Sequence, residues 1–167
     1  FLKKHPPIIN SLVFDAGCGT GANHLFLQQF GQVVSLDISL DALAFCRKRN
    51  LTRLVRGNLN RVNFKSCAFE IIASLDVLYH DWITNDKAIL DEFFRILKPG
   101  GQLLITDSAF PFLISRHDQA VMTRERYTLP GLKAKLHAAG FQIRRASYMF
   151  FTTFPVLATV RFLQSFS

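Results

Sequence analysis

The sequence has 167 residues, of which 49% are hydrophobic, and a formal net charge of +8. This length and apolar content suit one domain with a single core, spanning residues 1–167. The absence of repeats and low-complexity tracts argues against a solenoid or a disordered chain. No apolar run reaches about 18 residues and no signal-peptide pattern begins the chain, so neither a spanning helix nor an export signal is expected.

The excess of positive charge lies in the last third of the chain. Residues 1–109 hold 12 Lys and Arg against 10 Asp and Glu, whereas residues 110–167 hold 8 against 2. A solvated basic surface is the simplest explanation of this bias. The alternative is attraction to an anionic substrate, a membrane face or nucleic acid.

The cysteines and histidines do not form ligand or disulfide patterns. Cys18, Cys46 and Cys67 include no C-x-x-C pair and are odd in number, which argues against a disulfide framework and against a zinc ribbon. The histidines lack metal-ligand spacing, so we expect no metal site. A reducing, cytoplasmic setting is predicted.

Strand and helix signals alternate over the first two thirds of the chain. Short runs rich in apolar residues and strand formers predict strands, and apolar residues at helical spacing predict helices. The predicted strands are residues 12–16, 32–37, 53–57, 69–75 and 102–109, and the predicted helices are residues 23–30, 40–49 and 86–97. Repeated strand–helix units imply a mostly parallel, doubly wound, Rossmann-like sheet in an α/β fold, covered on both faces.

The pattern changes after Ala109. Residues 110–127 mix apolar and charged side chains with weak periodicity and are interpreted as an excursion over one end of the sheet. A helix is predicted between Thr128 and Ala139, and residues 141–150 alternate like a sixth strand. The apolar segment 149–167 is broken by Pro155 and is interpreted as a short helix or a hydrophobic flap.

The stretch "DAGCGTGANHLF", residues 15–26, follows the first predicted strand and is rich in glycine. A tight turn from a strand into a helix exposes free backbone N–H groups and the positive end of the helix dipole. Asp37 ends the second strand 20 positions after Gly17, a separation at which a carboxylate can reach a ribose. Together these features indicate a ligand that contains a nucleoside.

Five motifs resemble those of the class I S-adenosylmethionine-dependent methyltransferases. In chain order they are "VFDAGCGTGANHL", "VVSLDIS", "VRGNLNRVNF", "FEIIASLDVLYH" and "FFRILKPGGQLLITD". The resemblance covers roughly residues 11–147. The later stretches "RYTLPGLKAKLHAAGFQIRRASY" and "FPVLATVRFL" look like the small-molecule branch related to ubiquinone and menaquinone biosynthesis, the methyltransferase type 11 branch.

The resemblance implies S-adenosyl-L-methionine as cofactor and a definite site for it. The first acid and the glycine loop would line the methionine end, the second acid would hold the ribose, and the third-strand loop would border the adenine. Main-chain oxygens of the fourth strand would face the ammonium group. The implied residues are Asp15, Gly17, Cys18, Gly19, Asp37, Ile38, Asn58, Leu59, Ser74 and Leu75. Many relatives have Asp at the position of Asn58, and an amide still offers a carbonyl acceptor.

Methyl transfer from a sulfonium requires the acceptor atom in line with the C–S bond at about 3 to 3.5 Å, so positioning supplies much of the rate. Asp76, Tyr79 and His80 are the predicted acceptor-side catalytic residues, with His80 a base if the acceptor must lose a proton. The alternative for His80 is a packing histidine bonded to backbone. His117 and Tyr127 are weaker candidates, and Cys18 is expected to fill space because no paired base is evident.

The acceptor is predicted to be a small molecule, apolar and with an anionic or lipid-linked portion, because aromatic side chains and arginines gather in the later segments. These residues are Phe110, Phe112, Phe150, Phe151, Phe154, Arg116, Arg124 and Arg126. Peripheral membrane contact is compatible with this composition, whereas nucleic acid is disfavoured because no RNA-binding motif is present. The alternative explanation is that most of the phenylalanines belong to the core.

Two other functions stay open from the sequence. A glycine fingerprint also suits an NAD-dependent oxidoreductase, although the "LKPGG" turn and the fourth-strand motif do not support it. A noncatalytic methyltransferase-like binding module is the second alternative, and the intact glycine loop with Asp37 counts against it. No seventh strand is evident after Tyr148 and no full helix precedes the first strand, so the chain is interpreted as a trimmed or partial version of a longer protein.

Overall fold

The computed structural model describes residues 11–114, 116–149 and 154, and it contains one five-stranded sheet. All strand pairs are parallel, and the strand order is β3-β2-β1-β4-β5. The strands are β1 (Leu12–Ala16), β2 (Gln32–Asp37), β3 (Leu54–Arg56), β4 (Phe69–Leu75) and β5 (Leu97–Thr106). The predicted Rossmann-like α/β fold is therefore confirmed.

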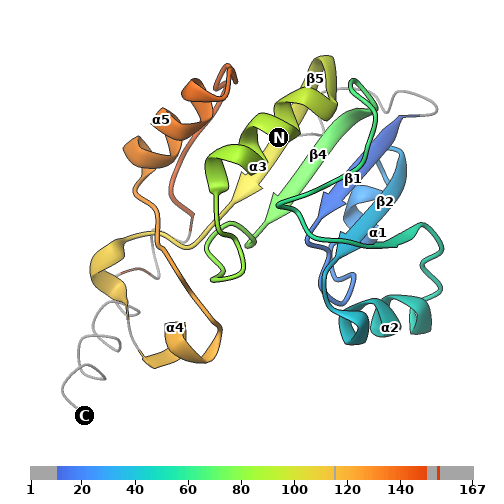
Figure 1. The fold of residues 1–167 in the computed structure, drawn as a ribbon, viewed down its shortest axis with the longest axis horizontal. Coiled ribbons are helices and arrows are strands. Elements are labelled where there is room, and N and C mark those ends of the chain that lie inside the picture. Colours follow the sequence, from blue (N-terminus) through green and yellow to red (C-terminus); the bar gives the residue numbers. More distant parts are fainter. Residues whose placement is uncertain (1–10, 115, 150–153, 155–167) are drawn as a thin grey trace.

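The strand order reverses beside β1. The chain first proceeds outward from β1 to β2 and β3, and then returns to place β4 on the other side of β1. All five carboxyl ends therefore lie at one edge, the lower edge in Figure 1, where open α/β sheets bind their ligands.

Helices cover both faces of the sheet, namely α1 (His24–Leu27), α2 (Leu40–Lys48), α3 (Asp86–Ile96) and α5 (Leu129–Ala138). The excursion adds a 3₁₀ turn, η2 (Pro111–Leu113), and a short helix, α4 (Arg116–Ala120), away from the sheet (Figure 1). Three helices begin with a side-chain cap, because Ser39, Asn85 and Thr128 each accept a hydrogen bond from the backbone N–H three residues later. Ser39 thus marks the start of the helix predicted over residues 40–49, which begins at Leu40 as α2.

The larger core lies between the sheet and the pair α3 and α5, and it includes Phe14, which is fully buried. The Phe14 ring stacks on Phe69 at 5.1 Å and meets Phe64 edge-on at 5.1 Å. Val13 and Leu27 belong to a smaller cluster under α1 on the opposite face. The alternation of Val13 and Phe14 between two apolar clusters explains why the central strands are nearly continuously apolar.

The predicted sixth strand over residues 141–150 is wrong for the part that is described, because residues 141–149 form no strand. Phe141 and Ile143 instead pack, partly buried, against the larger core. The Tyr148 hydroxyl accepts a hydrogen bond from the Leu129 N–H at 3.0 Å. The alternating pattern is therefore satisfied by side-chain packing and not by pairing with β5.

Other element boundaries also differ from the predictions, among them the end of β5 at Thr106 and not at Ala109. The helix predicted over residues 23–30 is limited to α1, because the Gln29 and Phe30 N–H groups bond three residues back in tight turns. Strand β5 begins at Leu97 and not at Gln102, since Leu97 already pairs with Phe69 across an irregularity in the ladder. The predicted segment 149–167 lies outside the described residues except for Met149 and Phe154.

We predict that Phe14→Ala lowers the free energy of unfolding by about 3–5 kcal/mol, because it leaves a cavity among packed aromatic rings. Phe14→Leu is expected to cost less, about 1–3 kcal/mol, since it retains most of the apolar volume. Urea denaturation measures both values. Phe45→Ala is the control because Phe45 is 52% exposed. Equal losses for Phe14→Ala and Phe45→Ala would contradict the placement of the core.

Candidate functional site

The glycine loop, residues 17–21, joins β1 to α1 at the carboxyl edge of the sheet. The Gly17 and Cys18 N–H groups both donate to the Leu36 carbonyl oxygen at 2.9 Å, so the loop turns over the end of β2. Gly17 has a φ of +80°, and a Cβ there would lie 2.7 Å from a Val77 methyl group. Gly19 has a φ of +52° and would place a Cβ in open space. One side of the loop is therefore tightly packed and the other is bare backbone.

Asp37 joins the glycine loop to the start of α2. Its Oδ2 accepts a hydrogen bond from the Gly19 N–H at 2.7 Å, and its Oδ1 accepts one from the Ser39 N–H at 2.9 Å. The next residue, Ile38, is 41% exposed at the same edge. The structure thus brings Gly19, Asp37 and Ile38 together, as the sequence predicts.

Asp15 lies under the glycine loop and is only 2% exposed. Its Oδ2 atom is buried and has no hydrogen-bond partner among the described residues. Burial raises the pKa of Asp15 to about 7, and the negative charge of Asp37 adds to the rise. The hydroxyls of Ser35 and Ser74 are also buried without a described partner. Unpaired polar atoms of this kind are costly, and their concentration near one strand edge indicates a ligand site.

The two cysteines beside the loop have packing roles. Cys18 is 6% exposed and Cys46 is fully buried, and the Cys46 thiol donates to the Gly19 carbonyl oxygen at 3.2 Å. Burial raises the pKa of the Cys18 thiol far above its usual range. A thiol held protonated is a poor nucleophile, which agrees with the expectation that Cys18 fills space.

Asn58 and Leu59 lie after β3, at the carboxyl edge. Leu59 is 6% exposed, whereas the Asn58 side chain is exposed. The Asn58 Oδ1 atom accepts hydrogen bonds from both the N–H and the side-chain amide of Asn60, at 2.9 and 2.8 Å. Asn60 also donates to the Trp82 carbonyl oxygen at 2.9 Å. The amide oxygen of Asn58 was predicted to face a ligand. In the structure it instead accepts hydrogen bonds from Asn60 within its own loop.

The fourth-strand loop, residues 76–82, follows Ser74 and Leu75 and contains the predicted acceptor-side residues. Asp76 is exposed and has a φ of +58°, unusual for a residue other than glycine. Its N–H donates to the Thr106 carbonyl oxygen at 2.8 Å, which aligns the ends of β4 and β5. The carboxylate of Asp76 is therefore presented at the edge of the sheet by strained backbone.

His80 is enclosed by two aromatic rings. Its ring lies 4.1 Å from the Tyr79 ring and 3.9 Å from the Trp82 ring, measured between centroids. The Nδ1 atom lies 3.2 Å from the Val121 carbonyl oxygen, so Nδ1 is the protonated nitrogen of the neutral ring and Nε2 has the free lone pair. Burial lowers the pKa of His80 below its usual value. This arrangement agrees with a neutral histidine and also with the packing alternative.

Asp107 is a candidate that the sequence reasoning missed. It directly follows β5, and its Oδ1 accepts a hydrogen bond from the Tyr79 N–H at 3.0 Å. Its Oδ2 atom is buried without a described partner. Burial raises the pKa of Asp107 to about 7, and the neighbouring Asp76 adds to the rise. The available signal was an acid near the carboxyl end of the strand predicted over residues 102–109.

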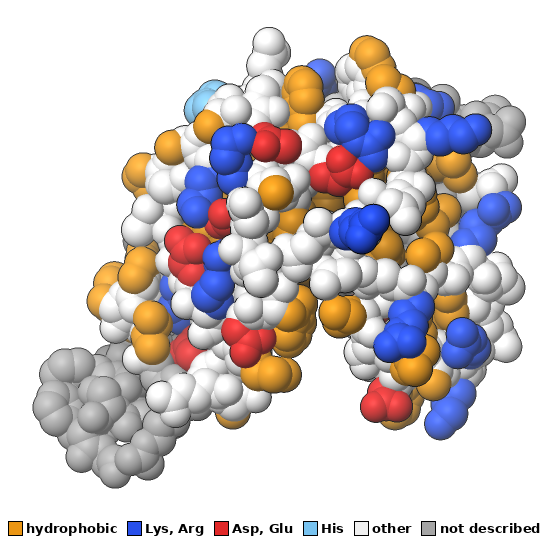
Figure 2. Space-filling view, viewed as in Figure 1, with side chains coloured by type: hydrophobic (Ala, Val, Ile, Leu, Met, Phe, Trp, Pro, Cys, Tyr) orange, Lys and Arg blue, Asp and Glu red, His pale blue; other side chains and the backbone are white. Residues whose placement is uncertain are grey.

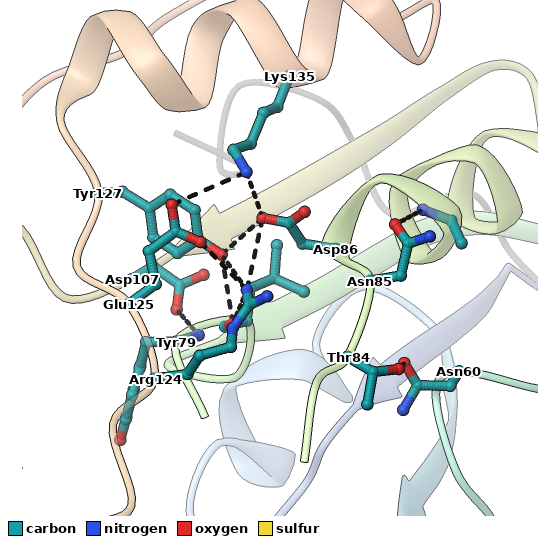
Figure 3. A network of polar contacts seen from close by, with 12 residues as sticks. Asn60, Tyr79, Thr84, Asn85, Asp86, Asp107, Arg124, Glu125, Tyr127 and Lys135 are labelled. Atoms are coloured by element: carbon teal, nitrogen blue, oxygen red, sulfur yellow. Dashed lines mark hydrogen bonds and ion pairs between the residues drawn. The ribbon is translucent and has the colours of Figure 1, made fainter. Parts of the chain in front are cut away.

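A polar network attaches the excursion to the rest of the fold (Figure 3). Asp86, at the start of α3, accepts hydrogen bonds from the Tyr127 hydroxyl at 2.9 Å and from Lys135 Nζ at 2.7 Å. Arg124 approaches the same carboxylate at 3.6 Å, and its backbone N–H donates to the Tyr79 carbonyl oxygen at 2.7 Å. Burial alone would raise the pKa of Asp86. The hydrogen bonds that Lys135 and Tyr127 donate outweigh this effect and hold the pKa of Asp86 below its usual value.

The arginines predicted to attract an anionic acceptor are paired inside the excursion. Arg126 is 9% exposed, contacts Asp118 at 2.6 Å and donates to the Ala109 carbonyl oxygen at 2.8 Å. Arg124 contacts Asp86 and Glu125. The structure therefore does not support an anion-binding role for these two side chains. The side chain of Arg116, like that of His117, lies outside the described residues.

No group of three or more His, Cys, Asp or Glu side chains that could hold a metal ion occurs among the described residues.

We predict that Asp15→Asn changes how stability depends on pH. Because the pKa of Asp15 is raised from 3.8 to about 7, the folded state binds more protons than the unfolded state between these values. The free energy of unfolding of the wild type should fall by on the order of 1–4 kcal/mol as the pH rises through this window. The variant should lose the part of that fall that Asp15 contributes, whereas the part contributed by Asp107, whose pKa is also raised to about 7, should remain. Urea denaturation at pH 5 and pH 8 measures it, and parallel profiles for the two proteins would contradict the account.

We predict that Tyr127→Phe lowers the free energy of unfolding by about 1–3 kcal/mol, because it removes a buried donor to Asp86. Amide hydrogen exchange at Arg124 and Glu125 should also become faster, because the network attaches this part of the excursion to the start of α3. Phe45→Leu is the control because Phe45 is 52% exposed and lies on α2, outside this network. Unchanged exchange in Tyr127→Phe would show that the network does not order the excursion.

Comparison with known proteins agrees with this fold. The methyltransferase domain family matches residues 14–105, which is more than half of the chain. A human protein named "Probable tRNA methyltransferase 9B" is 35% identical over 107 residues, covering 63% of this chain and 22% of that protein. Phosphoethanolamine N-methyltransferase 3 of Arabidopsis thaliana is 28% identical over 141 residues, covering 78% of this chain and 28% of that protein.

A solved S-adenosylmethionine-dependent methyltransferase from Mesorhizobium loti has the same fold, with a TM-score of 0.74 at 18% identity. The match covers 98% of this chain and 90% of that one. By contrast, this chain spans only 20% to 44% of the length of the first three curated relatives. The chain belongs to the methyltransferase domain family, and it shares its fold with a solved S-adenosylmethionine-dependent methyltransferase.

Proposed function

We propose that this chain forms one catalytic domain that transfers a methyl group from S-adenosylmethionine to a small-molecule or lipid-like acceptor. The observation that carries the proposal is the bare glycine loop over Asp15, whose Oδ2 atom is buried without a described partner. A buried, unpaired carboxylate oxygen beside exposed backbone suits a ligand with an ammonium group. S-adenosylmethionine has such a group and supplies a methyl group that its sulfonium already activates.

The residues around the loop fit this cofactor. Gly19 leaves open space where a side chain would stand, and Asp37 lies one hydrogen bond away from it. Asp37 would hold the ribose hydroxyls, with Ile38 against the adenine. The main-chain oxygens of Ser74 and Leu75 would add acceptors for the ammonium group. Asn58 would need to release Asn60 before its amide oxygen could contact the base, so Leu59 is the more direct neighbour.

The chain positions the acceptor with the fourth-strand loop. Asp76 and Asp107 place carboxylates on neighbouring strands, and Tyr79, held by Asp107, presents its ring beside His80. His80 Nε2 has the free lone pair and can take a proton if the acceptor must lose one. The aromatic neighbours exclude water from this side of the site. In-line placement of the acceptor supplies most of the acceleration, with acid–base chemistry secondary.

Relatives differ in what they methylate, so a second acceptor class is considered. The phosphoethanolamine N-methyltransferases act on a small molecule by name, and the 35–37% identical relatives named for tRNA point to a nucleic acid. The net charge of +8 is compatible with the second class. We favour the first class because no RNA-binding motif is present in the sequence. The predicted cytoplasmic setting is part of the same proposal, and the three cysteines are free thiols.

Calorimetric titration with S-adenosylhomocysteine tests cofactor binding, with NADH as the competing ligand. We predict that Asp37→Ala weakens S-adenosylhomocysteine binding by about 10- to 100-fold, the effect of losing a charge-assisted hydrogen bond of about 1.5–3 kcal/mol. Asp41→Ala is the matched control, since Asp41 is an exposed acid four residues away. Equal affinity in the two variants, or binding of NADH alone, would overturn the proposal.

The acceptor is tested with radiolabelled S-adenosylmethionine in parallel reactions. One set contains small amines, phenols and isoprenoid quinols, and the other contains bulk tRNA. Label transferred to a compound of the first set and lost in His80→Ala or Asp107→Ala supports the proposed site. Label found only in tRNA would replace the small-molecule acceptor with the second class.

A further inference from the structure

Eleven large apolar side chains are exposed among the described residues. Ten of them lie on α1, on the segment from Ile38 through α2, on the excursion or at residues 148–149. These ten are Leu25, Phe26, Ile38, Leu40, Phe45, Phe112, Ile114, Met122, Tyr148 and Met149. The exception, Phe94 on α3, packs edge-on against Phe141 at 5.3 Å. Scattered exposed apolar residues need no explanation, but a gathered set does.

Five of these side chains, which we call the rim, stand on the two lobes that flank the site. Leu40 and Phe45 are on α2, and they are 51% and 52% exposed. Phe112, Ile114 and Met122 are on the excursion and are 73%, 57% and 51% exposed. Figure 1 places α2 and α4 at opposite lower corners, and Figure 2 shows a hollow that opens between these lobes at the lower edge. The rim therefore borders the opening of the proposed active site.

Exposed basic side chains lie on α2 and on the segments before and after β3. No Asp or Glu occurs between Asp41 and Glu70, whereas seven Lys and Arg do, namely Arg47, Lys48, Arg49, Arg53, Arg56, Arg61 and Lys65. All seven are exposed, and none forms an ion pair within the described part of the chain. Arg124, Arg126 and Lys135 in the later segments are paired with carboxylates. Cations without a described carboxylate partner therefore occur on α2 and on the segments that flank β3, which we call the basic surface beside α2, and also at Lys133 and Arg144.

Helix α2 combines apolar and basic side chains on its exposed surface. Phe45 and Leu40 are solvent-exposed, and the last turn holds Arg47 and Lys48. Lys48 Nζ lies 5.1 Å from the centre of the Phe45 ring, so a cation and an aromatic ring share one surface. This mixture is typical of helices that lie in the interface of an anionic membrane.

We propose that the rim and the basic surface beside α2 dock on an anionic lipid bilayer, so that the active-site opening faces the membrane. This inference rests on the proposed function and specifies the acceptor as a molecule held in or on that bilayer. No helix among the described residues is long and apolar enough to cross a membrane, so the contact is peripheral. Aliphatic Leu40, Ile114 and Met122 favour lipid over RNA, because bases stack on aromatic and not on aliphatic side chains.

Co-sedimentation with vesicles tests the docking. The full chain is mixed with vesicles of phosphatidylcholine alone or of phosphatidylcholine with 30% phosphatidylglycerol, as probe compositions, at low and at high salt. Binding is expected to the anionic vesicles and to weaken at high salt, because each basic residue near the surface contributes about fivefold in affinity. Phe45→Ser and Phe112→Ser should each weaken binding at least fivefold, and Lys48→Glu should do the same.

Matched controls separate docking from folding. Phe94→Ser replaces the exposed apolar residue that lies off the rim, and Lys87→Glu reverses an exposed charge on α3. Both should keep wild-type vesicle affinity. Absence of binding to anionic vesicles, or equal losses in rim and control variants, would overturn the inference. Bulk tRNA that displaces the protein from vesicles and binds without Phe45 and Phe112 would also overturn it, in favour of a nucleic-acid surface.

Binding of S-adenosylhomocysteine to the same variants separates a failure of the proposed membrane contact from a failure of the proposed methyltransferase function. Phe45, Lys48 and Phe112 are outside the cofactor site, so their variants should bind it as the wild type does. Intact cofactor binding with no vesicle binding would reject the membrane surface alone. Vesicle binding without any cofactor binding would reject the proposed function and leave only a lipid-binding surface.

Discussion

The carboxylate of Asp37 fixes the geometry on which the rest of the site depends. It accepts one hydrogen bond from the Gly19 N–H and another from the Ser39 N–H, and it thereby ties the glycine loop to the start of α2 at the end of β2. A charged acceptor facing two backbone donors gives short, strong bonds. The bare face of the loop is held open by this tie and by the contact of Gly17 with Val77 on the other side. The proposed cofactor site therefore depends on three strand ends that meet at one edge.

Two buried acids at that edge are not compensated by cations. Asp15 lies in β1 and Asp107 follows β5, and each has a buried oxygen without a described partner and a pKa raised to about 7. Such groups cost stability, and the fold retains both beside the glycine loop and the fourth-strand loop. By contrast, Asp86 and Asp118 in the excursion are neutralised by Lys135 and Arg126. The acids that attach the excursion, Asp86 and Asp118, are thus paired with cations. The acids beside the proposed ligand site, Asp15 and Asp107, each keep an oxygen without a described partner.

Spatial pairing also changes which surface is basic. Counting charges along the chain places the positive excess after residue 109, and this count motivated an anion-binding role for Arg124 and Arg126. Both arginines are held by internal carboxylates, whereas residues 42–69 contain seven exposed cations and no acid. The exposed apolar side chains on α2 and the excursion flank the same opening. These two features together, and not the net charge, motivate the proposed membrane contact.

The local sequence determined the parts of this protein that depend on neighbouring residues alone. Apolar runs set the bounds of β1, β2 and β4, and a side-chain acceptor sets the cap at Ser39. The glycine loop follows from positions that require positive φ. Together with Asp37, these local features indicated the methyltransferase family from the sequence alone. Only the tertiary structure decided the features that depend on distant partners. Residues 141–149 alternate like a strand but pack by their side chains, the amide oxygen of Asn58 is taken by Asn60, and Asp107 becomes notable only because Tyr79 and Asp76 lie beside it. Strand pairing, burial and charge neutralisation depend on residues that are far apart in the chain. A hydrophobic periodicity or a charge count describes only neighbouring residues, so it cannot predict these contacts.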